Sequence, residues 1–401
     1  MRLFPLRRLS HVALLAFGLL MIAPTAAAQR TWIVDAYNGP GADFSDIRAA
    51  ITAAADGDII RVRFGTYTLP SGITRPLTIV GENHPVLLAP IAFAVGSIPY
   101  DREFVLKDLG LAALLSITVG ASAGRIHCDD VDFGSSTVAA LTISDCRYVT
   151  LNRCTFANVG SSSAALEING GSSVIMSECS ATGGDALLAG GSPAISVRDG
   201  SLLIIGHSTI VGGNATRGGT IPREAIAIRT NSRVELLGDD TTRVTAGSAW
   251  TASPGTYAII GDGSSTGLQH DPRNRIEGSG GSPAISNVSL VTQRSLATLR
   301  AAGTTPGHSI RVAILTAPGS PSLLLAGSPS QPLFLPGLGY LFINPSLIYQ
   351  AGAGVGGSNG LRFENLPIPN FALTGQPVTL QAIYADISGP QLTVPTVVVI
   401  G

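Results

Sequence analysis

Four ionisable residues occupy the same place in four successive copies of a short repeat: Asp130, Arg153, Glu178 and His207. Asp132 lies two residues after Asp130, so it faces the same side if this segment is a strand. Carboxylates supply the oxygen ligands that Ca²⁺ prefers, and a histidine can act as a general base. These five side chains are therefore the candidate catalytic or ligand-binding residues of the chain.

The repeat that aligns them reads Val149-x-Leu151-Asn152-Arg153-Cys154-x-Phe156 in its second copy. The other copies begin at Ile126, Val174 and Leu203. Apolar and polar residues alternate on both sides of a two-residue phase break, which predicts two strands that meet at a bend. Stacked strands lie about 4.8 Å apart, so the four ionisable residues are expected to form one outward-facing column.

A second repeat, with alanine followed by alternating apolar residues, lies between copies of the first. It begins at Ala140, Ala165, Ala194 and Ala225, with spacings of 25, 29 and 31 residues. Spacings that drift while the strands are kept are typical of a solenoid whose turns vary in length. An all-β sandwich is the alternative, but it would not keep two motifs in constant order over four cycles. The sequence therefore predicts an all-β chain built on a parallel β-helix.

The start of this body has a different pattern. Apolar residues recur at helical spacing over residues 44–55, with Asp43 placed as the N-cap, and residues 58–64 then alternate like a strand. Together with Gly65-Thr66-Tyr67 and Leu77-Thr78-Ile79-Val80-Gly81, this segment resembles the opening of right-handed parallel β-helix proteins of the pectin-lyase-like class. The resemblance implies a right-handed parallel β-helix over residues 29–300, with a short N-terminal capping helix.

The repeat is lost near residue 300, where prolines become frequent. Residues 310–401 are expected to form a small C-terminal β-sandwich, with strands near 378–384 and 394–400. Its ending resembles modules appended to other exported bacterial proteins, which indicates no activity. Such a module can cap the open end of the β-helix, whose last coil otherwise exposes unpaired strands.

The N-terminus has the three parts of a secretory signal peptide. Arginines at positions 2, 7 and 8 precede an apolar run over 12–22 and three alanines at 26–28. Residues 1–28 are therefore a predicted signal peptide, and a secreted, periplasmic or cell-surface location is expected. No second apolar run is long enough for a membrane span, and charged residues, only 13% of the chain, form no basic stripe for nucleic acid.

Two interpretations of the charged column remain. The resemblance implies chemistry in which carboxylates hold calcium against an acidic sugar while a base, often an arginine, removes a proton. Asp130, Asp132 and Glu178 are then the metal ligands, and Arg153 or His207 is the base; however, none of the family's catalytic motifs occurs here. The alternative is a structural ladder of alternating charge, whose exposed pairs are worth about 0–1 kcal/mol each. We favour the ladder.

Cys154 and Cys179 hold the same position in adjacent coils, with Cys128 at a neighbouring inward position. The coil spacing falls within the Cα range of a disulfide, but parallel Cβ vectors disfavour one. We expect free buried thiols. Apart from calcium, no cofactor is indicated, because phosphate loops, zinc spacings and nucleophile elbows are missing from the sequence.

The sequence therefore favours a non-catalytic exported β-helix that serves as a surface scaffold, an adhesin or a glycan-binding protein. The alternative is a polysaccharide lyase or hydrolase that acts on the β-helix flank, which rests on likeness of fold. In both cases the expected partner is a polysaccharide or a cell-surface glycan.

Overall fold

The computed structural model describes residues 29–400 apart from 90, 114–115, 136–137, 159–162, 186–190, 216–221, 238–240, 249–255, 294–297, 303–307, 317, 337, 359–360, 369–374, 387–388 and 394. The predicted signal peptide, residues 1–28, lies outside the described residues. A bilayer-spanning helix is absent from the part of the chain that the structure describes.

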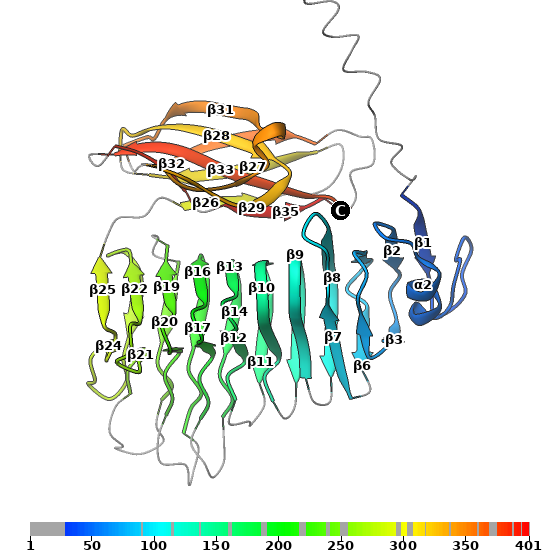
Figure 1. Cartoon of the computed structure of the whole chain (residues 1–401), viewed down its shortest axis with the longest axis horizontal. Coiled ribbons are helices and arrows are strands. Elements are labelled where there is room, and N and C mark those ends of the chain that lie inside the picture. The colour runs from blue at the N-terminus through cyan, green and yellow to red at the C-terminus, as the bar shows by residue number, and fades with distance from the viewer. Residues whose placement is uncertain are drawn as a thin grey trace, which may run out of the picture.

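The body is a parallel β-helix of about nine turns (Figure 1). Its strands stack in three parallel sheets, because each strand pairs with the strand one coil earlier and one coil later. Some strands are long and turn a corner, so they contribute to more than one sheet.

Sheet 1 contains β1 (Thr31–Val34), β2 (Ile59–Val62), β5 (Thr78–Gly81), the start of β8 (Glu103–Ala113), the middle of β9 (Ser116–Ser135), the end of β10 (Leu141–Asn152), β13 (Ser173–Ser177), β16 (Leu202–Gly206), β19 (Arg233–Leu236), β22 (Gly267–His270) and β25 (Leu290–Gln293).

Sheet 2 contains β3 (Thr66–Thr68), β6 (Val86–Ala89), the ends of β8 and β9, β11 (Thr155–Asn158), β14 (Ser180–Thr182), β17 (Thr209–Val211), β20 (Arg243–Thr245) and β23 (Arg275–Glu277). Sheet 3 contains β4 (Gly72–Ile73), β7 (Ala92–Gly96), the starts of β9 and β10, β12 (Leu166–Asn169), β15 (Ile195–Val197), β18 (Ile226–Ile228), β21 (Ile259–Gly261) and β24 (Ile285–Ser286).

The register confirms both sequence repeats. Val149 aligns with Val174 and Val174 with Leu203 in sheet 1, and all three side chains are at most 1% exposed. Leu166 and Ile195 of the alanine repeat align in sheet 3 and are fully buried. Side chains at alternate positions therefore fill one continuous apolar core along the solenoid axis.

The N-terminal end of the solenoid is closed by the helix α2 (Ile47–Ala53), which buries Ile47, Ala50 and Ile51 against the core. The predicted N-cap is wrong: Asp46 caps the helix by accepting a hydrogen bond from the Arg48 backbone N–H. Asp43 instead accepts the N–H of Ile33 in β1 at 2.9 Å. Asp43 thus stabilises the turn that leads into the helix, instead of capping the helix itself.

The C-terminal region forms the predicted small sandwich, and it begins with β26. One antiparallel sheet contains β26 (Thr298–Ala302), β27 (Ser309–Leu315) and β32 (Leu361–Pro367). The other contains β28 (Pro321–Gly327), β31 (Tyr349–Val355), β33 (Pro377–Asp386), β34 (Gly389–Leu392) and β35 (Thr396–Val399). Beside them lie the hairpin β29 (Pro329–Leu335) and β30 (Gly339–Ile343) and the short 3-10 helix η2 (Pro345–Leu347). The two larger sheets enclose a separate apolar core.

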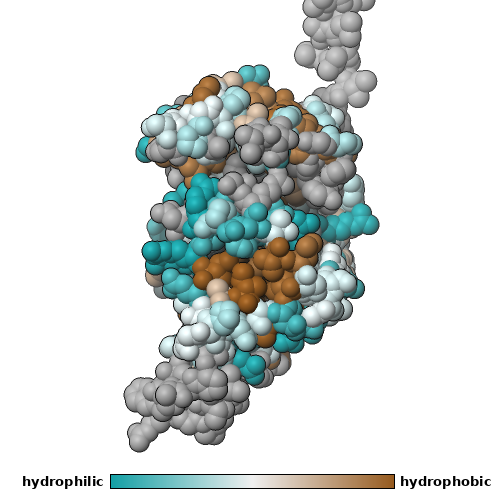
Figure 2. Space-filling model, turned by 90° about the vertical axis from the view of Figure 1, so that its left-hand side faces the viewer, coloured by the Kyte–Doolittle hydropathy of each residue, from teal (hydrophilic) through white to brown (hydrophobic). Residues whose placement is uncertain are grey.

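The sandwich lies along the flank of the β-helix, so the expectation that it caps the open end is wrong (Figure 1). It docks on sheet 1, where the outward-facing Ile175 and Ile204 are each only 5% exposed and share a cluster with Phe342 of β30. The sandwich docks there because sheet 1 carries apolar residues on its outer face, and these are stabilised when they are shielded from water. Among the described residues, no strand follows β23, β24 and β25 in the stack, and this end shows an apolar patch (Figure 2).

Candidate functional site

The predicted column exists, and it lies at the corner between sheets 1 and 2. All four members adopt the left-handed backbone conformation, with φ of 59° at Asp130, 52° at Arg153, 55° at Glu178 and 50° at His207. The backbone N–H groups of Arg153 and Glu178 donate to the carbonyls of Ser177 and Gly206 in the next coil. The two-residue phase break in the sequence is therefore a tight corner that turns each side chain outward.

Arg153 is held by a buried carboxylate. Its guanidinium lies 2.5 Å from Asp129 Oδ1, and Asp129 is only 1% exposed. Asn152 also donates to Asp129, at 2.8 Å. Burial raises the pKa of Asp129, which the charges of Arg153 and Lys107 partly offset. Because Arg153 neutralises a buried charge, it is not placed as the proton-accepting base of a lyase.

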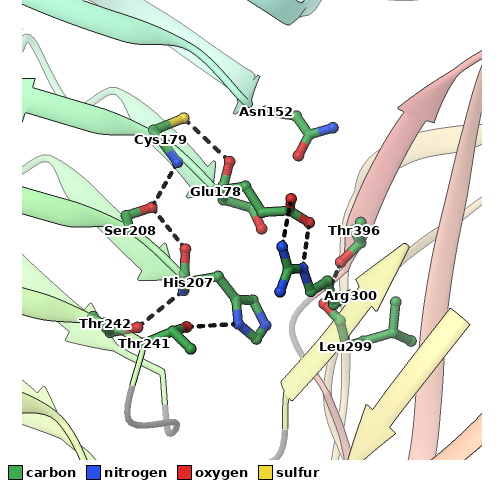
Figure 3. A network of polar contacts seen from close by, with 12 residues as sticks. Asn152, Glu178, Cys179, His207, Ser208, Thr241, Thr242, Leu299, Arg300 and Thr396 are labelled. Carbon is green, nitrogen blue, oxygen red and sulfur yellow. Dashed lines mark hydrogen bonds and ion pairs between the residues drawn. The ribbon is translucent and has the colours of Figure 1, made fainter. Parts of the chain in front are cut away.

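Glu178 faces the C-terminal sandwich. Its two carboxylate oxygens accept from the Arg300 guanidinium of β26 at 3.1 and 3.2 Å (Figure 3). The carboxylate side chain is 14% exposed and the arginine 52%. Arg153 and Glu178 thus find their ion-pair partners outside the column. The column is a row of stacked corners, and the expectation that its charges pair along it is wrong.

The two aspartates have separate environments. Asp132 contacts His84 Nε2 at 3.1 Å, and the other ring nitrogen of His84 lies 3.1 Å from Asp108. Asp130 is exposed at the corner. Asp132 and Glu178 therefore bind different partners and do not converge on one cation. Among the described residues, no group of three or more His, Cys, Asp or Glu side chains is arranged to hold a metal ion.

His207 lines a cavity beside the column. A pocket of about 470 Å³ lies between this corner and the sandwich, and its walls come from both parts of the chain. His207 extends from the β-helix and Arg300 from β26 toward this space (Figure 3). The lining residues are His207, Thr298, Arg300, Arg311, Ala313, Leu315, Leu361 and Phe363.

The strand register explains how the sandwich builds its wall of the pocket. Arg300 of β26 aligns with Ala313 of β27, and Ala313 aligns with Phe363 of β32. Arg311 lies two residues before Ala313, on the same face, with its guanidinium 4.6 Å from the Phe363 ring centroid. The small side chain of Ala313 leaves a hollow between a cationic edge and an aromatic surface. Phe363 is 51% exposed, which is high for a phenylalanine.

A second polar cluster lies under the sandwich on sheet 1. Glu103 aligns with Arg125 and Arg125 with Tyr148, while His127 contacts Thr150 at 2.7 Å. Burial lowers the pKa of His127 to about 3 and raises those of Glu103 and Tyr148. His127 Nε2 and the Tyr148 hydroxyl have no hydrogen-bond partner among the described residues. The ring of Phe342 packs on Tyr148, with centroids 5.8 Å apart, and Tyr148 and His127 are at most 1% exposed, so these two side chains are not accessible to a polymeric ligand.

The four cysteines are free buried thiols, as expected. The backbone N–H of Cys154 donates to Cys179 Sγ at 3.3 Å. Burial raises the pKa of Cys128 and Cys154, and raises that of Cys146 to about 11. The raised pKa values keep Cys128, Cys146 and Cys154 as thiols, and burial makes all four cysteines small apolar residues of the core.

Of the residues that line the pocket, only His207 belongs to the sequence repeat. Arg300, Arg311 and Phe363 lie beyond the last repeat, so no periodicity aligned them with the column. One signal was present: Arg311 sits between the buried Ile310 and Val312, which marks it as outward-facing on a strand.

No protein-family model matches the chain, and a comparison with curated proteins finds no match either. The resemblance of residues 44–81 to β-helix proteins is therefore supported at the level of the fold, by the parallel solenoid itself.

Proposed function

We propose that this protein is an exported, non-catalytic β-helix that binds an acidic glycan in the pocket between His207 and Phe363. The observation that carries the proposal is the presence of two arginines and a half-exposed aromatic ring in one cavity. A guanidinium recognises a carboxylate or sulfate with paired N–H donors. The exposed face of Phe363 offers an apolar surface to the C–H groups of a sugar ring.

Charge distinguishes this pocket from a site for neutral sugars. Arg311 and Arg300 both line the cavity; Arg300 is ion-paired with Glu178, whereas the guanidinium of Arg311 lies over the Phe363 ring. Both walls are formed only when the sandwich is docked, because His207 belongs to the β-helix and Phe363 to β32. The pectin-lyase-like resemblance and the predicted signal peptide also support an exported, carbohydrate-directed role.

The test is a direct binding measurement with the purified protein. Calorimetric titration with oligogalacturonate is expected to show saturable binding, and titration with the matching neutral oligosaccharide is not. Arg311→Ala and Phe363→Ala should each weaken binding at least tenfold, about 1.4 kcal/mol. Arg243→Ala, which removes an exposed arginine of sheet 2, is the matched control and should leave the affinity unchanged. Equal affinity for the neutral and acidic oligosaccharides would contradict the proposal.

One observation favours a second candidate, a polysaccharide lyase: the imidazole of His207 lines the same pocket as the two arginines. In a lyase, the arginines would hold the uronate carboxylate and His207 would remove the neighbouring proton. Unsaturated uronate products that disappear in His207→Ala would support the lyase. Binding without such products, with or without calcium, supports the non-catalytic protein.

A further inference from the structure

The C-terminal end of the β-helix is an open cross-section of the core. β23, β24 and β25 each pair with a strand of the preceding coil and with no strand beyond it among the described residues. The inward-facing side chains of these strands, and of Val288 between β24 and β25, have no described coil above them: Val291 is 46% exposed, and Ile276, Ile285 and Val288 are only partly buried. Figure 2 looks at this end and shows the apolar patch ringed by hydrophilic residues.

This end also carries backbone groups that have no partner among the residues described by the structure. The Arg275 N–H donates to Thr242 and the Glu277 carbonyl accepts from Ala246, so both face the preceding coil. Neighbouring residues of a strand direct their N–H and C=O groups to opposite sides. The N–H and C=O of Ile276 therefore point away from the solenoid. Such an edge, with a patch of bare core beside it, is a template for pairing with another strand.

We propose that this end is the interface of a tail-to-tail homodimer, with β23 pairing antiparallel to β23 of a second copy. A twofold axis perpendicular to sheet 2 would place Ile276 opposite Ile276 of the other copy, and the two residues would exchange both backbone hydrogen bonds. The same axis places sheet 1 of one copy against sheet 3 of the other. Val291 in sheet 1 of one copy then covers Ile285 and Val288 of the other. The apolar cores would then be continuous across the dimer.

Charge identifies the occupant as a second copy of this chain. The strand Arg275-Ile276-Glu277 is self-complementary, because antiparallel pairing about Ile276 sets Arg275 opposite Glu277 of the other copy, twice by symmetry. Both side chains are exposed and lie on the outer face of sheet 2. The opposite end of the solenoid is closed by α2, so head-to-tail growth into a fibre is blocked. Tail-to-tail pairing therefore closes at two copies.

The experiment is sedimentation equilibrium of the purified protein, from micromolar to submillimolar concentration. The wild-type chain should dimerise. Arg275→Glu and Glu277→Arg each create two like-charge contacts and should raise the dimer dissociation constant at least tenfold. The double variant R275E/E277R reverses both charges and should restore the wild-type constant. Arg243→Glu, in the same column one coil earlier, is the matched control and should have no effect.

Circular dichroism of each variant checks that the β-helix remains folded. A wild-type chain that is monomeric throughout, or a dimer that both single charge reversals leave unchanged, would overturn the proposal. A folded double variant that remains monomeric would overturn it as well. A monomer whose Ile276 amide is protected from hydrogen exchange would show that a segment of the same chain covers the end, which also refutes a dimer.

Discussion

The Lys107 ammonium donates a hydrogen bond of 2.7 Å to the backbone carbonyl of Val399, across 292 residues of sequence. Lys107 belongs to the β-helix strand β8 and Val399 to β35 of the sandwich. The lysine is 8% exposed, and it lies beside the buried carboxylate of Asp129. A buried charge must be paired to be tolerated, so this contact requires the sandwich to dock in one position.

Lys107 is the single lysine of the chain, which makes it a specific reporter of docking. Burial lowers its pKa, an effect that the carboxylate of Asp129 partly offsets. A lowered pKa gives more of the reactive free amine, so only steric protection can slow its modification. We expect an amine-reactive ester to leave Lys107 unmodified in the native protein and to modify it fully in denaturant. Peptide mass spectrometry reads the result, and modification of the native protein at the rate of a free amine would show that the sandwich is not docked.

Phe342 is expected to supply much of the apolar part of this contact. It packs on Tyr148 and shares a cluster with Ile175 and Ile204 of sheet 1. Phe342→Ala should lower the free energy of unfolding by about 3 kcal/mol and should speed the modification of Lys107. Phe363→Ala removes a half-exposed ring of the same size, and should cost under about 0.5 kcal/mol. Urea unfolding measures both, and equal losses would place the docking surface elsewhere.

The solenoid could be predicted because two independent sequence motifs each recur once per coil and both define the strand register. Both the corner at Arg153 and the alanine strand at Leu166 recur once per coil, and the structure aligns them as expected. Local capping preferences were not enough to predict the start of the helix α2. Asp43 and Asp46 both suit an N-cap, and only the tertiary contact from Asp43 to β1 decided between them.

The docking of the sandwich and the pocket could not be predicted from periodicity. Outward-facing Ile175 and Ile204 signal that sheet 1 needs a cover, but they do not identify it. The site brings His207 together with Arg311, more than a hundred residues away, and no repeat links the two segments. The charge ladder failed for the same reason, since Glu178 pairs with an arginine supplied by the sandwich.

The buried His127 should make the protein less stable in acid. Burial lowers its pKa from 6.5 to about 3, and the nearby Arg125 guanidinium adds to this effect. Between those values the unfolded chain binds a proton on this residue that the folded chain does not. Stability is therefore full above pH 6.5 and falls with acidification, by up to roughly 1.4 kcal/mol per pH unit.

His127→Gln should remove this part of the pH dependence. Between pH 7.5 and 4.5, the wild-type free energy of unfolding should fall by about 2–3 kcal/mol more than that of the variant. Urea unfolding at the two pH values gives the comparison. His270→Gln, which removes a histidine at the end of β22, should keep the wild-type dependence. Parallel behaviour of His127→Gln and the wild type would mean that His127 is solvated.

The ion pair with Glu178 offsets the positive charge that Arg300 presents to an anionic ligand. Neutralising this carboxylate in Glu178→Gln should leave the guanidinium available to an anionic ligand, and should strengthen oligogalacturonate binding about two- to fivefold, or roughly 0.5–1 kcal/mol. The same change loses one contact between the sandwich and the β-helix, so the free energy of unfolding should fall by up to about 1 kcal/mol. Calorimetric titration and urea unfolding of one preparation test both effects. Weaker binding in this variant would mean that Glu178 itself contacts the ligand.

The four thiols offer a last test of the packing inside the β-helix. Cys128, Cys154 and Cys179 lie in adjacent coils and are at most 3% exposed, and burial raises the pKa of the first two. Thiol reagents need both access and the thiolate, so we expect no reaction with Ellman's reagent in the native protein at neutral pH. Unfolding in guanidinium without reductant should release all four thiols together, because they share one cooperative core. Two missing thiols, recovered after reduction, would reveal a disulfide, and Cys154 and Cys179 would be the pair to examine first.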